Sequence, residues 1–301
     1  MLNLQESLAQ KRRKVKISME IKAHAKINLS LDIVGKRSDG YHELDTLFYE
    51  LSLHDLLIVE KQEKEGIFLN CSDETLSCSQ DNLIYKAVKL LQEKYQIKKG
   101  VRIYLEKNIP MGAGLGGGSS DAAAALKAVN ELFNLNIPRE NLKEFGAKLG
   151  ADVPFFIEGG MARAQGIGEQ LTPLKKKKLW PMIVIKPEVS VPTVWAYKEA
   201  DKVENPLHPD IKTLLKSLEE ENYSQVCESL GNSFEKAVCS QYPQIEEVKK
   251  ELLFYGADVS VMTGSGAAVF ALFDNAERAE KAADQLEKKH KEWKIFRELG
   301  D

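Results

Sequence analysis

The stretch IPMGAGLGGGSSDAAAAL, residues 109–126, places five glycines within seven residues and then runs into alanines. It follows VRIYLEK (101–107), which alternates like a strand, and it leads into a segment with one continuous apolar helical face. Glycines let backbone N–H groups approach a ligand, and a helix N-terminus adds unpaired donors and a positive dipole end. We expect Ser119 or Ser120 to cap this helix. The stretch therefore predicts a phosphate-binding site.

Several glycine-rich loops bind phosphate, and their contexts differ. Gly112, Gly114 and Gly117 satisfy GxGxxG, but the dinucleotide fold expects an acidic residue closing a second strand about twenty residues later, where this chain continues a helix. A Walker A loop starting at Gly112 needs lysine at position 118, which is glycine. The HRD and DFG motifs of protein kinases are absent. The loop therefore indicates nucleotide-phosphate binding of another type.

Composition narrows the class of protein. The 301-residue chain has a net charge of −3, so the chain as a whole lacks the excess positive charge typical of nucleic-acid-binding proteins. No apolar run reaches the roughly 18 residues of a membrane span, and the basic N-terminal segment lacks the apolar run of a signal peptide. We expect a cytoplasmic protein with no nucleic-acid or membrane partner. Its four cysteines lack zinc-site spacing, and we expect them to be reduced and structural.

The order of predicted elements indicates an α+β fold. Strand alternation starts at Met19, so residues 1–18 are expected to form a poorly ordered extension. Strands are predicted at 44–52, 56–60 and 101–107, and a helix at 82–95. Strands and helices do not alternate regularly, which argues against a doubly wound sheet. The pattern of predicted strands and helices changes near residue 160, and we expect domains at 19–163 and 164–301.

Two further motifs allow the glycine-rich stretch to be compared with a particular protein family. HAKINLSL (24–31) lies near the start of the chain and VMTGSGAAVFALF (261–273) near its end. Together the three motifs resemble those of the GHMP kinase family, the galactokinases, homoserine kinases, mevalonate kinases and phosphomevalonate kinases. The resemblance implies two domains, an N-terminal half like ribosomal protein S5 domain 2 and an α/β C-terminal half. It also implies an ATP-dependent kinase that uses Mg²⁺ and acts on a small alcohol.

Three stretches resemble one branch of that family more closely. They are AKINLSLDIVGKRSDGYHELDTLFYEL (25–51), LGADVPFF (149–156) and KPEVSVPTVWAY (186–197). This branch phosphorylates the 2-hydroxyl of 4-diphosphocytidyl-2-C-methyl-D-erythritol in the non-mevalonate route to isoprenoids. The alternatives are a family member acting on homoserine or a mevalonate derivative, a non-catalytic nucleotide-binding relative, and a dinucleotide-dependent oxidoreductase. GYH (40–42) argues against the first, because those substrates carry no base to stack.

The resemblance implies a catalytic pair. Asp152 is the candidate base for the acceptor hydroxyl, although an aspartate before Val-Pro is by itself typical of a turn. Lys26 is its matching partner, and it would stabilise negative charge in transit. Asn28 lies two residues further on, on the same strand face, and could hydrogen-bond the substrate. Intact Lys26 and Asp152 argue against a non-catalytic relative.

The resemblance also implies binding residues. Tyr41 and His42 would hold cytosine, Tyr197 would close its other face with Thr193 nearby, and the turn Gly264, Ser265 and Gly266 would line the site. The protein ligands of Mg²⁺ stay open, with Ser120 one possibility, and a monomer or weak homodimer is expected. Asp121 is expected to point away from the phosphates. The residues expected to hold ATP are Pro110, Met111, Gly112, Ala113, Gly114, Leu115, Gly116, Gly117, Gly118, Ser119 and Ser120.

Overall fold

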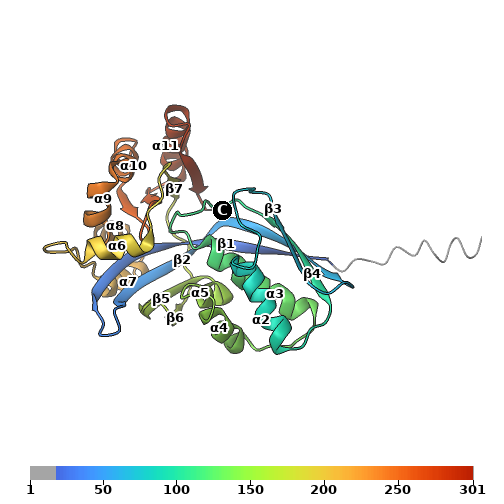
Figure 1. The fold of residues 1–301 in the computed structure, drawn as a ribbon. Coiled ribbons are helices and arrows are strands. Elements are labelled where there is room, and N and C mark those ends of the chain that lie inside the picture. Colours follow the sequence, from blue (N-terminus) through green and yellow to red (C-terminus); the bar gives the residue numbers. More distant parts are fainter. Residues whose placement is uncertain (1–17, 301) are drawn as a thin grey trace, which may run out of the picture.

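The computed structural model describes residues 18–300. Its framework is a long antiparallel pair, β1 (Ser18–Lys36) and β2 (His42–Gln62), registered from Ser18 opposite Glu60 to Lys36 opposite His42. The two strands expected at 44–52 and 56–60 are one continuous strand. Register shifts in β1 accommodate the bending of so long a ribbon. This pair crosses the whole molecule (Figure 1).

The pair organises a seven-stranded sheet. Its main path is β3 (Ile67–Cys71), β4 (Gly100–Glu106), β2, β1 and β8 (Gly231–Asn232). The second half of β2 pairs with β4, and its first half pairs with β5 (Met161–Gly166), which pairs with β6 (Gln170–Leu174). β8 returns from late in the chain to lie parallel to β1. One sheet therefore draws on both halves of the sequence.

The expected domain limit at 163/164 falls inside β5. Because β5 and β6 belong to the first sheet, we propose that the first domain extends to Leu174 and that the second begins near Met182. The expected N-terminal extension lies outside the described residues, except Ser18, which starts β1.

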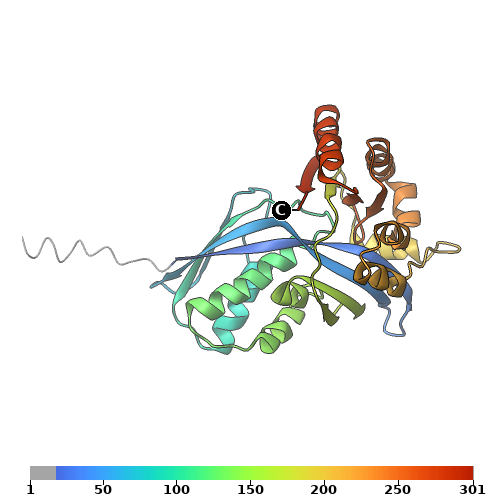
Figure 2. The same ribbon diagram turned by 180° about the vertical axis from the view of Figure 1, so that it is seen from behind.

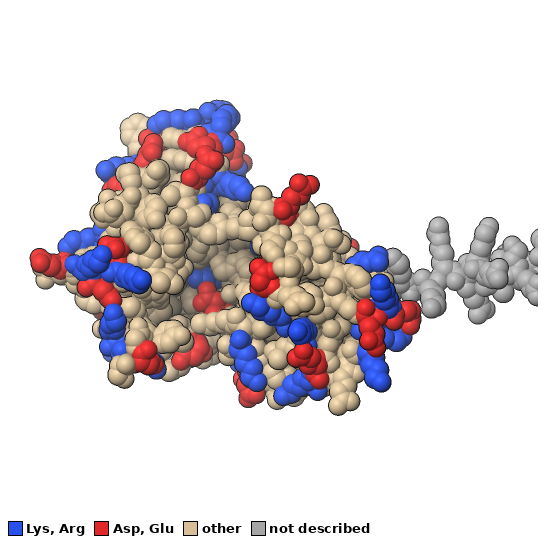
Figure 3. Space-filling view, in the orientation of Figure 1, with Lys and Arg blue, Asp and Glu red and all other residues tan. Residues whose placement is uncertain are grey.

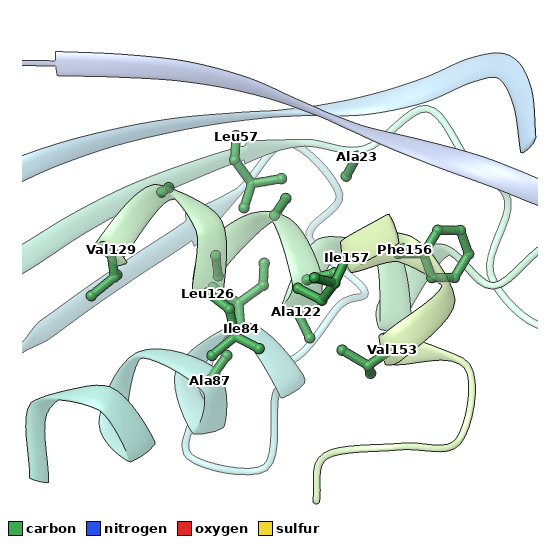
Figure 4. Packing of buried hydrophobic residues seen from close by; sticks show 14 of the residues in the cluster. Ala23, Leu57, Ile84, Ala87, Ala122, Leu126, Val129, Val153, Phe156 and Ile157 are labelled. Carbon is green, nitrogen blue, oxygen red and sulfur yellow. The ribbon is translucent and has the colours of Figure 1, made fainter. Parts of the chain in front are cut away.

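Four helices cover one face of the first sheet: α2 (Leu83–Lys94), α3 (Gly117–Leu132), α4 (Arg139–Ala147) and α5 (Val153–Glu158). Figure 2 shows them together beneath the strands. The predicted helix at 82–95 is α2, and the side chain of Asn82 caps it by accepting from the N–H of Ile84. Leu57 of β2, Leu126 of α3 and Ile84 of α2 belong to one buried hydrophobic cluster in this core (Figure 4). The alanine-rich face of α3 lets these elements approach closely.

The second lobe has a four-stranded antiparallel sheet. Its order is β11 (Lys294–Glu298), β7 (Met182–Lys186), β10 (Val269–Leu272) and β9 (Val259–Met262). Its helices are α6 (Thr193–Ala200), α7 (Ile211–Glu219), α8 (Tyr223–Ser229), α9 (Glu235–Gln241), α10 (Pro243–Phe254) and α11 (Ala276–Lys289). Segregated sheets and helices confirm the predicted α+β class.

The two lobes share a core across the central strand. Ile27 and Leu29 of β1 are buried with Val184 of β7 and Phe270 of β10. These side chains occupy one face of β1, so the opposite face is free to present Lys26 and Asn28. Within residues 18–300, the helices are all too short or too polar to cross a membrane.

Candidate active site

The glycine loop turns directly into α3. This helix begins at Gly117, and Gly116 occupies the N-cap position with a φ of +71° and no side-chain cap. The prediction that Ser119 or Ser120 caps the helix is wrong, because both lie within its first turns. A left-handed residue at position 116 reverses the chain, which glycine adopts without steric cost. A Cβ there would also come within 2.6 Å of the Phe156 ring.

Backbone hydrogen bonds bring the three sequence motifs together. The N–H of Lys26 donates to the carbonyl of Leu115 at 3.0 Å, and the N–H of Ala268 donates to the carbonyl of Ala113 at 3.1 Å. The N–H of Asn28 donates to the Thr263 hydroxyl at 2.7 Å. The first and third motifs thus hold the glycine loop from two sides.

Buried Asn232 of β8 supports this junction, and sequence reasoning missed it. Its amide nitrogen donates to the carbonyls of Met262 and Gly264 at 2.7 and 2.8 Å. It therefore fixes the turn that follows β9. The asparagine occurs in an unremarkable sequence context, and only the pairing of β8 with β1 places it here.

A cavity of about 430 Å³ lies over the glycine loop. The N-terminus of α3 faces it, so unpaired N–H groups and the positive end of the helix dipole point toward a bound anion. Ser120 is 2% exposed and is buried inside α3, whereas Ser119 contributes to the cavity wall. The loop and helix residues that line the cavity are Pro110, Met111, Gly112, Ala113, Gly114, Leu115, Gly116, Gly117, Gly118 and Ser119.

A buried charge cluster lies at the edge of this cavity. Lys107 is paired with Asp55 and with Asp121, whose Oδ2 is 3.0 Å from the ammonium. Asp55 also accepts from the backbone N–H groups of Asn108 and Ile109, at the entry to the glycine loop. Asp121 therefore faces Lys107, and its second oxygen, Oδ1, is buried without a hydrogen-bond partner among residues 18–300.

Burial controls the protonation of that cluster. Removal from water raises the pKa of Asp121 to about 8, against the opposing effect of Lys107. Burial disfavours the charge on Lys107, but Asp121 and Asp55 outweigh it and raise its pKa. The one available clue in the sequence was Asp55, a charged residue within the apolar alternation of β2.

A second cavity, of about 270 Å³, adjoins the first and shares Gly114 and Gly116 with it. It contains both members of the expected catalytic pair. The Nζ of Lys26 is 3.5 Å from Oδ2 of Asp152. Figure 3 shows the corresponding hollow between the two lobes, with basic and acidic atoms at its floor.

The Lys26 side chain is held in a defined position. It is 5% exposed, its ammonium donates to Oδ1 of Asn28 at 2.8 Å, and it lies 4.8 Å from the centre of the Phe48 ring. Asn28 in turn donates to the Thr46 hydroxyl at 2.7 Å. Asp152 immediately precedes α5, where its side chain is one-third exposed. A restrained cation thus faces a carboxylate that a ligand can reach.

Residues of the second lobe complete this cavity. Thr193, Tyr197, Gly264 and Ser265 line it, and the hydroxyls of Thr193 and Ser265 are 3.0 Å apart. Gly266 instead packs behind the turn, where a Cβ would come within 3.0 Å of the Met262 sulfur.

The expected base-binding residues are only partly assembled. His42 stacks on Tyr197 with ring centres 4.6 Å apart and planes inclined by 21°. Tyr41, in the turn before β2, is 60% exposed. Burial raises the pKa of Tyr197 to about 12, and the nearby charge of Asp152 adds to this, so its hydroxyl is neutral at ordinary pH. Tyr197 lines the cavity, whereas Tyr41 and His42 lie outside its wall.

Metal ligands do not gather in the described part of the chain. Residues 18–300 contain no group of three or more His, Cys, Asp or Glu side chains placed to hold a metal ion.

Comparisons with known proteins agree with this geometry. Residues 82–160 match the model of the GHMP kinases N-terminal domain, and residues 207–292 match that of the GHMP kinases C-terminal domain. A 4-diphosphocytidyl-2-C-methyl-D-erythritol kinase of Caldicellulosiruptor bescii is 43% identical over 89% of this chain and 94% of its own length. Its counterpart from Clostridium beijerinckii is 42% identical over 93% of this chain and 100% of its own.

Solved structures extend the comparison. A crystal structure of 4-(cytidine 5'-diphospho)-2C-methyl-D-erythritol kinase superposes with a TM-score of 0.80 at 36% identity, covering 93% of this chain and 98% of its own. A homoserine kinase from Cytophaga hutchinsonii, at 20% identity and a TM-score of 0.75 over 95% and 96% of the two chains, shares the fold. The chain therefore belongs to the GHMP kinase family of ATP-dependent kinases, and within it to the 4-diphosphocytidyl-2-C-methyl-D-erythritol kinases.

Proposed function

We propose that this chain transfers the γ-phosphate of ATP to the 2-hydroxyl of 4-diphosphocytidyl-2-C-methyl-D-erythritol. The observation that carries the proposal is the Lys26–Asp152 pair, which lies in a cavity adjoining the glycine loop. Phosphoryl transfer needs alignment and charge compensation more than covalent participation by the protein. The two adjoining cavities supply one place for each reactant.

In this mechanism the glycine loop and the start of α3 hold the ATP phosphates by backbone N–H groups. The acceptor hydroxyl lies beside Asp152, which receives its proton as the new P–O bond forms. Lys26 faces the same space, and its ammonium stabilises negative charge on the transferring group. The backbone bond from Lys26 to Leu115 keeps the catalytic strand in register with the phosphate loop.

The proposal includes Mg²⁺ bound to the nucleotide. This ion prefers oxygen ligands and retains several waters, so phosphate oxygens can supply most of its shell. Ser119, on the wall of the phosphate cavity, offers a hydroxyl oxygen that fits such an ion. Ser120 does not fit, because it is buried within α3. When bound, the ion would neutralise phosphate charge.

At the other end of the acceptor, we propose that Tyr41, His42 and Tyr197 bind the cytosine base. Stacking of a base on an aromatic ring is worth roughly 1–3 kcal/mol in nucleic-acid sites. Asn28, Thr193, Gly264 and Ser265 line the same cavity as the catalytic pair, where we propose that they contact the rest of the substrate. Gly266 does not line the cavity, and we propose that it supports the turn that carries Gly264 and Ser265. We also propose that the enzyme acts in the cytoplasm as a monomer or weak homodimer.

One experiment tests the reaction. The protein is incubated with ATP and Mg²⁺ and, in parallel, with the cytidine-diphosphate substrate, homoserine or mevalonate, while ADP is followed. We expect ADP formation above background with the cytidine compound and not with the other two alcohols. ADP formation confined to homoserine or mevalonate, or absent from all three, contradicts the proposal.

A variant tests the base site. Tyr41→Ala is expected to raise the KM for the cytidine substrate much more than the KM for ATP, because it removes a stacking surface. Tyr104→Ala is the matched control, since Tyr104 is also a partly exposed tyrosine but lies on β4 outside both cavities. Equal weakening of both substrates by Tyr41→Ala would refute the assignment of this residue.

A further inference from the structure

His42 and Asp201 form a contact between the two lobes. His42 begins β2, and Asp201 directly follows α6. Nε2 of the imidazole lies 2.6 Å from Oδ1 of the carboxylate, and the histidine side chain is only 9% exposed. The second carboxylate oxygen, Oδ2, accepts from the ammonium of Lys36 at 2.5 Å. Each oxygen of Asp201 therefore has its own donor.

This arrangement determines which imidazole nitrogen carries the proton. Hydrogen bonds from Lys36 and His42 lower the pKa of Asp201, so its carboxylate is ionised at neutral pH and can only accept. Nε2 of His42 must then donate. In a neutral imidazole, a proton on Nε2 leaves Nδ1 as a hydrogen-bond acceptor. Within residues 18–300, Nδ1 makes no hydrogen bond.

Packing also fixes the direction of the ring. One face of His42 lies on Tyr197, and Tyr197 meets Phe234 edge-on at 4.9 Å. Phe234 is 1% exposed, so this stack rests on the core of the second lobe. A nearly buried histidine with one nitrogen tied to a carboxylate and the other unpaired thus presents a single, oriented acceptor.

We propose that Asp201 selects the base of the substrate by fixing His42 as a hydrogen-bond acceptor. An acceptor at Nδ1 takes the exocyclic amino group of cytosine and opposes the carbonyl that uracil carries at the same position. This inference rests on the proposed function, in which His42 faces the base. Asp201 is a positioning residue, because it acts through His42. Since a polar group left unmatched in a desolvated site is costly, we expect about tenfold to hundredfold discrimination.

Lys36 makes the proposal testable with a single isosteric change. In Asp201→Asn, the side chain offers one acceptor and one donor pair. Lys36 has only donors, so it takes the amide oxygen and leaves the amide NH₂ facing Nε2 of His42. Nε2 must then accept, and the imidazole proton moves to Nδ1. The variant therefore converts the recognition atom from an acceptor to a donor.

Removing Lys36 from that variant provides a rescue. In the double variant Lys36→Met/Asp201→Asn, the amide oxygen is free to turn toward His42 and restore the Nε2–H form. Lys36→Met by itself leaves Asp201 as a carboxylate and keeps the acceptor at Nδ1. If the role of Asp201 were purely structural, the preference for the cytosine base would not be lost in Asp201→Asn and recovered in the double variant.

The experiment measures inhibition by CDP and by UDP against the cytidine substrate at saturating ATP, with the full chain. We expect CDP to inhibit about tenfold or more strongly than UDP in the unaltered protein and in Lys36→Met. Asp201→Asn should lose this preference and raise the KM for the cytidine substrate more than it lowers kcat. The double variant should regain part of the preference. An unchanged CDP preference in Asp201→Asn overturns the inference.

A spectroscopic measurement keeps the inference testable if a variant does not fold. Two-bond ¹H–¹⁵N correlations of the histidine rings in the unaltered protein distinguish the two tautomers. We expect His42 to carry its proton on Nε2, and a proton on Nδ1 at pH 8 would overturn the inference. Failure of the unaltered protein to phosphorylate the cytidine compound is a different outcome, because it contradicts the proposed function and leaves the tautomer measurement intact.

Discussion

Lys26 Nζ lies 3.5 Å from Asp152 Oδ2, although Lys26 belongs to the central strand β1 and Asp152 to the turn before α5. The lysine is nearly buried, and the aspartate is one-third exposed. A fixed cation thus faces a carboxylate that substrate can reach, beside the glycine loop that would hold ATP.

Asp152→Asn should abolish most turnover and leave ATP binding intact. The amide keeps the shape of the side chain but cannot accept the hydroxyl proton as a base. General-base catalysis contributes about 10²- to 10⁴-fold to the rate, and we expect kcat to decrease by a factor in that range. Steady-state kinetics and ATP affinity check this, with exposed Asp274→Asn as the matched control. A kcat equal to that of the control would remove Asp152 as the base.

Lys26→Met should lower kcat by about 10²- to 10³-fold, the usual cost of removing one charge-stabilising donor. Methionine preserves the packing against Phe48 while removing the ammonium that faces Asp152. Lys22→Met changes an exposed lysine on the same strand and should leave kcat unaltered. If both variants behaved alike, Lys26 would have no electrostatic role in the reaction.

Gly114→Ala should lower the free energy of unfolding by about 1–3 kcal/mol, because position 114 has a φ of +77°. The new Cβ would also lie 2.8 Å from the backbone oxygen of Thr263, which cannot move without disturbing the third motif. Gly118→Ala is the contrasting variant. Position 118 lies within α3, and a Cβ there would meet nothing closer than 3.8 Å.

Because alanine favours a helix interior over glycine, Gly118→Ala should stabilise by about 0.5–1 kcal/mol. Urea unfolding at equilibrium measures both variants. Equal destabilisation at positions 114 and 118 would argue against the steric and conformational account of the loop.

Asp121→Asn should change how stability depends on pH. Burial raises the pKa of Asp121 from 3.8 to about 8, so the folded state holds a proton that the unfolded state releases at lower pH. The contribution of Asp121 to stability is therefore fully present below pH 3.8 and is lost as the pH rises to about 8. Asparagine removes this loss and leaves Lys107 paired with Asp55.

Thermal unfolding at several pH values checks this prediction. The unaltered protein and Asp121→Asn should be similar in stability near pH 4, and the variant should be more stable near pH 8. A difference that stays constant across this range would show that Asp121 does not titrate between the two values.

The local features of the phosphate site could be predicted from the sequence. Glycines at positive φ and an adjacent amphipathic helix depend on residues close in the chain, and the structure confirms the loop and helix α3. The start of that helix was misplaced because Gly116, rather than a serine, occupies its N-cap position. The three motifs were enough to indicate the family, since they occur in order between residues 24 and 273.

Long-range pairing could not be predicted in the same way. β5 and β6 look like isolated short strands in the sequence, but they pair with β2 and extend the first sheet beyond residue 163. The cluster of Asp55, Lys107 and Asp121 combines residues from β2, the loop that follows β4, and α3. No local pattern reports whether three such charges will be buried together.

The sequence by itself determined where a phosphate loop and its helix form, because glycine conformations and apolar periodicity act over a few residues. The resemblance paired Lys26 with Asp152, but only the tertiary structure decided how close the two side chains lie, that Asp201 holds His42, and that a buried carboxylate borders the nucleotide cavity. Those relationships join separate strands and both lobes. Their energies depend on distance and on exclusion of water, which arise only when the sheets and helices pack.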